Sequence, residues 1–211
     1  IQTTHIVPID LNCLLYKLEI LLSHFYAELL ESELSSKFAA YAQIRRDAIN
    51  LYLWDEQAGV YHDFDFIQSQ KTAIQSLAAC LPLFCEIASD QQAEQIAYKL
   101  DNSFLMEGGL VTTLNDTAQQ WDAPNGWAPL QYFAVVGLIN YGFAPLSVTI
   151  MTRWMTTVEQ QFITNNNMME KYNVQHSQYV AKGGEYEVQH GFGWTNGVAL
   201  AFYKLLEAHN S

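Results

Sequence analysis

The sequence predicts a mainly α-helical protein built from helical hairpins whose long loops gather at one end. Apolar residues recur at a spacing of three or four over most of the chain, as they do on one face of an α-helix. Short polar links between these helical segments alternate with long loops that are rich in glycine and aromatic residues. Long loops of this kind are usually functional. The alternation therefore indicates a toroid of helical hairpins with a pocket among its long loops.

The elements follow from the pattern in order along the chain. A helix is expected at residues 9–30, and its apolar stripe from Leu11 to Leu29 is expected to pack in the core. A second helix is expected at residues 34–53. The next stretch, "WDEQAGVYHDFDF", changes to an alternating pattern around a glycine and predicts a small β-hairpin. Further helices are expected at residues 76–88, 91–100, 128–141, 146–162 and 195–208.

Composition limits the classes of function. At 211 residues and 24.0 kDa, residues 1–211 form one domain or part of one. The net charge of -12 argues against a nucleic-acid partner and an anionic membrane surface. Cys13, Cys80 and Cys85 form no CxxC pair and are expected to be buried free thiols. No apolar run could span a bilayer and no signal peptide is recognisable, so we expect a soluble protein, cytoplasmic or periplasmic. The chain does not begin with Met, which leaves the compartment open.

The stretch "QQWDAPNGWAPLQYF" places two indoles and a carboxylate just before a helix. Pro and Gly residues between Trp121 and Trp127 are expected to prevent regular structure there, so helix packing cannot explain both indoles. We therefore expect this loop to contact a ligand. Trp121, next to Asp122, is the better sugar platform, whereas Trp127 is equally compatible with core packing.

A second long loop, "MMEKYNVQHSQYVAKGGEYEVQHGFGWTNG", combines acids, aromatic residues and glycines. Carboxylates accept hydrogen bonds from sugar hydroxyls, and flat rings cover the apolar faces of sugars. Glycines let the backbone approach a ligand closely. The combination points to a carbohydrate, although such loops also occur as structural corners.

These two loops resemble known signatures. "QWDAPNGWAPLQ" and "GGEYEVQHGFGWTNGV" are similar to the two C-terminal signatures of the trehalase family of glycoside hydrolases, and "IVPIDLNCLLYKLE" resembles another segment of that family. The similarity runs in order over essentially the whole chain. It implies an all-α (α/α)6 toroid that hydrolyses α,α-trehalose to glucose with inversion, without a metal or other cofactor.

The resemblance also implies roles for individual residues. Glu170 in "MEKY" matches the general base of the family, and Glu185 matches an acid that binds substrate. Trp121, Asp122, Trp127 and Trp194 lie in the matched signatures as candidate substrate-binding residues. Two departures stand out. A run of four glycines in the family is "AKGG" here, and the proline that follows Glu-Tyr in the family is Glu187.

One expected group has no counterpart. The general acid of the family is an aspartate in a "GWD" stretch upstream of "PIDLN", and this chain starts after that point. We therefore expect the C-terminal part of a trehalase, inactive alone, whose partners are trehalose and the missing N-terminal half of the same protein. Two alternatives stay open. One is another (α/α)6 enzyme acting on α-glucosides, and the other is a non-catalytic sugar-binding fragment.

Overall fold

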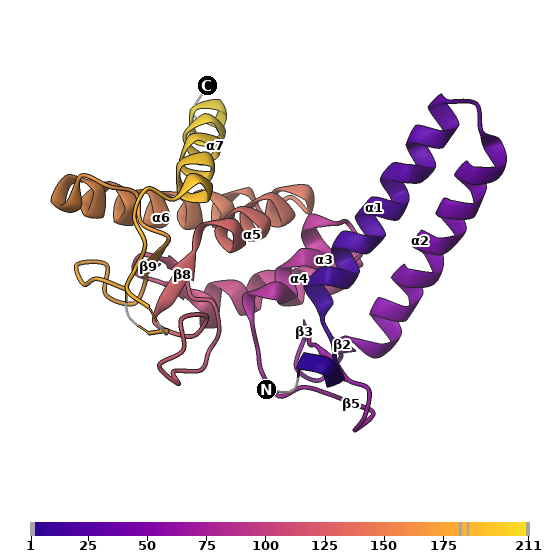
Figure 1. Ribbon diagram of the computed structural model, residues 1–211, viewed down its shortest axis with the longest axis horizontal. Helices are drawn as coiled ribbons and strands as arrows, with labels where there is room; N and C mark the ends of the chain where they lie inside the picture. Colours follow the sequence, from indigo (N-terminus) through magenta and orange to yellow (C-terminus); the bar gives the residue numbers. More distant parts are fainter. Residues whose placement is uncertain (1–2, 182, 185, 210–211) are drawn as a thin grey trace.

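The structure is a computed structural model that describes residues 3–181, 183–184 and 186–209. It is mainly helical (Figure 1), as the sequence predicts. Its α-helices are α1 (Ile9–Glu28), α2 (Ser32–Tyr52), α3 (Leu81–Phe84), α4 (Asp90–Lys99), α5 (Ala128–Asn140), α6 (Ala144–Asn165) and α7 (Gly193–His209). Within the described ranges, no helix is both long enough and apolar enough to cross a membrane.

Most helices lie within a few residues of the predicted ranges, and the segment 76–88 is the exception. It forms a short 3-10 helix, Leu77–Cys80, followed by the single turn of α3. Pro82 lies in the first turn of α3, where its missing N–H costs nothing, but it could not continue a helix from the preceding residues. The chain leaves the helical conformation again at Glu86, whose φ is 59°.

Short strands are more numerous than the single hairpin that the sequence predicts. The expected hairpin is β2 (Trp54–Asp55) with β3 (Val60–Tyr61), which pair in antiparallel fashion. A second hairpin follows directly, and its first strand also pairs with a strand near the N-terminus, in the order β1-β4-β5. The remaining pairs are β6–β7 and β8–β9. The bounds of these other strands are β1 (Ile6–Val7), β4 (Phe64–Asp65), β5 (Gln70–Lys71), β6 (Leu105–Met106), β7 (Gly109–Leu110), β8 (Asn125–Trp127) and β9 (Lys171–Asn173).

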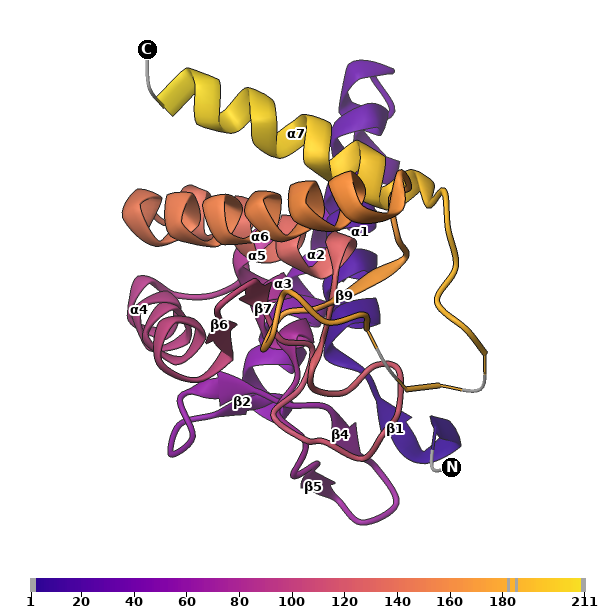
Figure 2. The same ribbon diagram turned by 90° about the vertical axis from the view of Figure 1, so that its left-hand side faces the viewer.

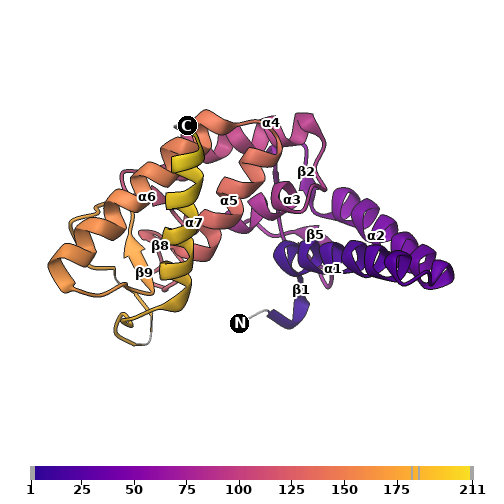
Figure 3. The same ribbon diagram turned by 90° about the horizontal axis from the view of Figure 1, so that it is seen from above.

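The helices are arranged in two groups. Helices α1 and α2 form an antiparallel hairpin that projects away from the rest of the molecule (Figure 1), and Arg45 on α2 donates two hydrogen bonds, of 2.9 and 2.8 Å, to the Glu19 carboxylate on α1. Helix α5 packs against α3, α6 and α7 at the other end of the molecule. Figure 3 shows α7 crossing over α5 and α6. The core is continuous between the two groups through α3.

The prediction that the leucine stripe of α1 packs in the core is wrong for this chain. The side chains of Leu11, Leu14, Leu18, Leu21, Phe25 and Leu29 are exposed. A different face of α1, with Cys13 and Tyr16, is buried instead. Because α1 is apolar on two faces, the periodicity could not distinguish the face that packs within this chain from the face that stays open. We call the six exposed residues the open face of α1.

The three cysteines are buried and free, as predicted. Burial raises the pKa of the Cys13 and Cys80 thiols well above the ordinary range. It raises the pKa of the Cys85 thiol to about 11. These side chains therefore act as small apolar groups in the core at neutral pH.

Candidate active site

A pair of short strands joins the two long loops. Strand β8 pairs with β9 in antiparallel fashion, and Trp127 lies opposite Lys171. The prediction of no regular structure before Trp127 is therefore wrong, because the backbone of residues 125–127 is extended and finds a partner across the site. The pairing extends one residue beyond the strands, since Val174, after β9, donates its N–H to the carbonyl of Pro124, before β8, at 2.9 Å. Figure 2 shows both loops on one side of α5 and α6.

The loop before β8 is held by its aspartate. Thr113 donates its hydroxyl to one Asp122 carboxylate oxygen at 2.8 Å, and Thr117 donates to the other. The backbone carbonyl of Asp122 accepts from Asn125 N–H at 3.0 Å. Asp122 thus closes its own loop in this structure, and its contact with substrate stays a prediction.

Three indoles form one aromatic group, of which one member faces solvent. The Trp121 and Trp127 rings stack with centroids 3.9 Å apart and planes at 7°, and Trp194 meets Trp127 edge-on at 5.7 Å. Trp121 is 44% exposed, whereas Trp127 is 1% exposed and donates its Nε1–H to the carbonyl of Gln120. The geometry leaves Trp121 free to offer a ring face to a ligand. Trp127 supports it from beneath.

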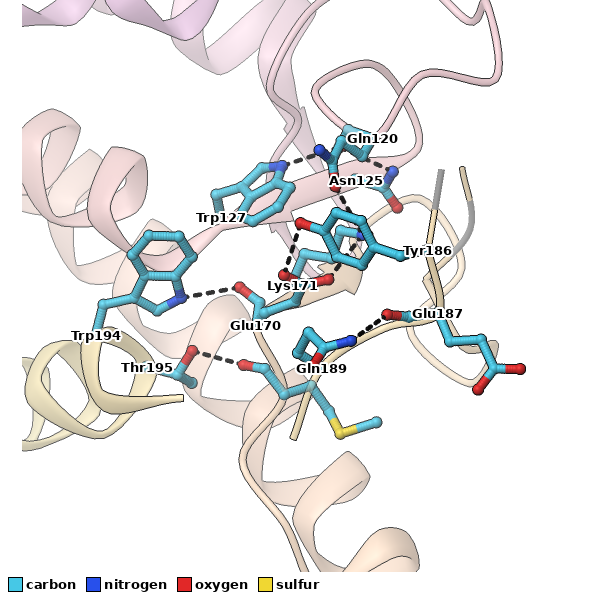
Figure 4. A network of polar contacts seen from close by, with 11 residues as sticks. Gln120, Asn125, Trp127, Glu170, Lys171, Tyr186, Glu187, Gln189, Trp194 and Thr195 are labelled. Carbon is cyan, nitrogen blue, oxygen red and sulfur yellow. Dashed lines mark hydrogen bonds and ion pairs between the residues drawn. The ribbon is translucent and has the colours of Figure 1, made fainter. Parts of the chain in front are cut away.

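Glu170 stands immediately before β9, where three segments converge (Figure 4). Its N–H donates to the carbonyl of Gln189 at 3.0 Å, and its carbonyl accepts from Trp194 Nε1 at 3.0 Å. The carbonyl of the preceding Met169 accepts from the hydroxyl of Thr195 at 2.7 Å. The backbone of Glu170 is therefore fixed both by the second long loop and by the start of α7. Its side chain is 1% exposed.

The carboxylate of Glu170 has a buried charge partner that the sequence did not reveal. Lys171 Nζ lies 2.9 Å from Oε1, and its side chain has no exposed surface. The hydroxyl of Tyr186 donates to Oε2 at 3.4 Å. Adjacent residues in a strand point to opposite faces, so two neighbours such as Glu170 and Lys171 would not be expected to form an ion pair. It forms here because Glu170 precedes the first residue of β9. The adjacent "EK" letters were the only signal of this pair, and a weak one.

The trehalase family model matches residues 1–207, nearly the whole chain. The chain belongs to the trehalase family. Among solved structures it is similar to the neutral trehalase Nth1 from Saccharomyces cerevisiae, with 28% identity and a TM-score of 0.83. A GH63 mannosylglycerate hydrolase from Thermus thermophilus has 21% identity and a TM-score of 0.74. An uncharacterised conserved protein from the same organism has 20% identity and a TM-score of 0.76.

These similarities confirm the expected fold class, a mainly α structure of the (α/α)6 toroid type. The match covers 97% of this chain but 39% of the yeast trehalase. For the two Thermus structures it covers 95% and 94% of this chain, and 45% and 48% of those chains. This trehalase-family chain therefore spans less than half the length of the solved relatives that it matches.

The "AKGG" stretch of the second long loop keeps glycine where the backbone requires it. Gly183 and Gly184 have φ of +88° and +97°, a region that residues with a side chain rarely adopt. A Cβ on Gly183 would lie 2.8 Å from the carbonyl oxygen of Ala118, because the two long loops touch at this point. Ala181 is buried. Glu185, the predicted substrate-binding acid, lies outside the described residues, and its role in this trehalase-family chain stays a prediction.

Proposed function

We propose that the chain supplies the base-bearing part of an α,α-trehalase, which hydrolyses trehalose to two glucose molecules with inversion at the attacked carbon. The observation that carries the proposal is the placement of Glu170. Its carboxylate is buried where both signature loops and the start of α7 meet, and its backbone is held on both sides. A general base needs this kind of fixed position to act on one water molecule.

Inversion requires two carboxyl groups on opposite faces of the sugar. One protonates the leaving oxygen and the other removes a proton from the attacking water, and the two lie roughly 6.5–9.5 Å apart. In our proposal Glu170 is the base. The acid comes from outside residues 1–211, because the resemblance places it upstream of "PIDLN".

Sugar binding in the proposed site rests on the aromatic group and the second long loop. Trp121 presents an exposed ring face for one glucose ring, and Trp127, which stacks behind it, contacts Trp194 edge-on. Glu185 accepts hydroxyl hydrogen bonds in this proposal, and Asp122 shapes the loop that carries Trp121. The reaction uses water and carboxyl groups, so the proposal includes no metal or other cofactor.

The proposed protein partner is the missing N-terminal half, which would cover the open face of α1. Exposed apolar surface on this scale is unusual for an isolated domain. Beside the α1–α2 hairpin, a groove of about 690 Å³ lies between the helices and the β1-β4-β5 sheet, with Ile44, Tyr52 and Phe66 among its walls. Both surfaces lie on the hairpin that projects from the rest of the chain (Figure 1), where further hairpins of a toroid would pack.

The test is the kinetics of a Glu170→Gln variant in the reconstituted protein, meaning residues 1–211 produced together with the upstream half. We expect kcat for trehalose to fall by at least about 10²–10⁴-fold with a modest change in KM, because the carboxylate acts on water in the transition state. Glu187→Gln, an exposed carboxylate of the same loop, is the matched control and should keep kcat. Near-normal kcat in Glu170→Gln would show that the base is another group.

A second enzymatic function is favoured by the structural similarity to the GH63 hydrolase, which has the same fold. The chain would then belong to another (α/α)6 enzyme acting on α-glucosides. Release of glucose from maltose or kojibiose, with none from trehalose, would establish this alternative. If the reconstituted protein binds sugar but hydrolyses none of these substrates, the non-catalytic sugar-binding role is correct.

A further inference from the structure

The proposed base, Glu170, forms a buried ion pair with Lys171. A general base does not itself require a cation at this position. The side chains of Glu170 and Lys171 are 1% and 0% exposed. Burying a carboxylate is costly in free energy unless a cation or several hydrogen bonds compensate its charge. Lys171, at 2.9 Å, supplies the compensating charge.

The two carboxylate oxygens of Glu170 have unequal partners. Oε1 accepts a charge-assisted hydrogen bond of 2.9 Å from Lys171 Nζ. Oε2 has a 3.4 Å contact with the hydroxyl of Tyr186, which is long for an O–H···O hydrogen bond. Oε1 is therefore held more strongly than Oε2.

Lys171 is also held by groups that carry no charge. Its Nζ lies 5.2 Å from the ring centroid of Trp127 and 5.2 Å from that of Tyr186, within the range of cation–π attraction. The side-chain oxygen of Gln120 accepts a further contact at 3.4 Å. These groups come from β8, the second long loop and the loop before β8 (Figure 4), so three segments besides Glu170 hold the ammonium in place.

We propose that Lys171 is the positioning residue of Glu170: it holds Oε1 and thereby directs Oε2, which the Tyr186 hydroxyl contacts at 3.4 Å, toward the attacking water. This inference rests on the proposed role of Glu170 as base. In the step, the water oxygen forms a bond to the anomeric carbon and its proton moves to Oε2. The glycosidic C–O bond breaks with its electron pair going to the leaving glucose oxygen, which takes a proton from the acid outside this chain.

The experiment is a double-mutant cycle in the reconstituted protein, with kcat and KM for trehalose measured for Lys171→Met, Glu170→Gln and the double variant. Lys171→Met should lower kcat by about 10²-fold with little change in KM, the size expected for a misplaced catalytic group. If Lys171 acts through Glu170, the double variant should be no slower than Glu170→Gln alone. A purely structural lysine would instead lower the rate by the same factor in both backgrounds, which would overturn the inference.

One control and the two single variants separate the possible failures. Lys17→Met removes a surface ion pair with Glu86, at 3.4 Å, and should leave kcat unchanged. Full kcat in Lys171→Met, beside a disabled Glu170→Gln, overturns the inference and leaves the proposed function intact. Full kcat in Glu170→Gln overturns the proposed function, and this inference with it.

A further variant decides the question if Lys171→Met does not fold, since it leaves a buried carboxylate without its cation. Gln120→Met removes the weaker 3.4 Å contact to Nζ from a half-buried position, and it leaves both charges in place. It should lower kcat severalfold when Glu170 is present and have no effect in the Glu170→Gln background. Equal losses in both backgrounds, or no loss in either, would overturn the inference.

Discussion

The loop end of the molecule and the α1–α2 hairpin differ in how completely their side chains find contacts within this chain. At the loop end, β8 and β9 pair, Glu170 has Lys171, and the Asp122 carboxylate has two hydroxyl donors. On the hairpin, one side of α1 packs against α2 and α3, while the side chains of the open face of α1 are 40–68% exposed.

The difference follows from what it costs in free energy to leave each kind of group without a protein contact. Buried polar and charged groups are costly without partners, so the buried groups of the site need hydrogen-bond and charge partners within the chain. Apolar side chains can stay exposed, because exposing them costs free energy in proportion to their area and breaks no specific contact. The chain thus pairs its buried charges at the loop end and leaves apolar side chains exposed on the hairpin.

The largest effect on stability is expected at the buried indole of the site. Trp127→Ala in residues 1–211 should lower the free energy of unfolding by about 3–5 kcal/mol, the range for removing a large buried aromatic side chain. Denaturant unfolding followed by circular dichroism measures this change. A loss no greater than that of Trp121→Ala, on the exposed partner of the stack, would show that the loop end is less well packed than we infer.

The hairpin should respond differently on its two sides. Ile49→Ala on α2, at a buried position, should cost about 2–5 kcal/mol in the same unfolding experiment. Leu18→Ala on the open face should cost less than about 0.5 kcal/mol, as for an ordinary surface site. The same Leu18→Ala change should weaken association with the upstream half, measured by ultracentrifugation. Equal costs at Ile49 and Leu18 would contradict an open face.

A smaller effect is expected on ligand affinity at the exposed indole. Trp121→Ala should weaken the binding of a trehalase inhibitor to the reconstituted protein by roughly 1–3 kcal/mol, through loss of a large apolar contact. Trp121→Phe, which keeps a flat ring, should recover part of the loss. An unchanged inhibition constant for Trp121→Ala would assign this indole to loop packing.

Helical periodicity predicted most of the fold, and its failures have physical causes. The long helices follow from their apolar spacing, whereas the segment around Pro82 breaks into separate turns. The strand at residues 125–127 was missed because its partner lies far along the chain, at Lys171–Asn173, and local patterns do not show such pairing. The open face of α1 was misassigned because apolarity alone does not show which of two apolar faces of a helix is buried.

The site was predictable only through its signatures. On composition alone, Glu170 beside a lysine and a tyrosine is typical of a solvated surface residue. Its burial depends on contacts with Gln189 and Trp194, which come from later segments of the chain. Lys171 and Tyr186 acquire their positions from the same tertiary convergence, which no local pattern encodes.

The most direct test of the account compares glucose release from trehalose by residues 1–211 alone, by the reconstituted protein, and by the reconstituted protein lacking the upstream acid. We predict activity in the reconstituted protein only. Loss of general-acid assistance alone should cost at least about 10²–10⁴-fold, and loss of pocket walls adds to it. Substantial glucose release by residues 1–211 alone would contradict the account, because it would require an acid within this chain, with Asp122 the first residue to test.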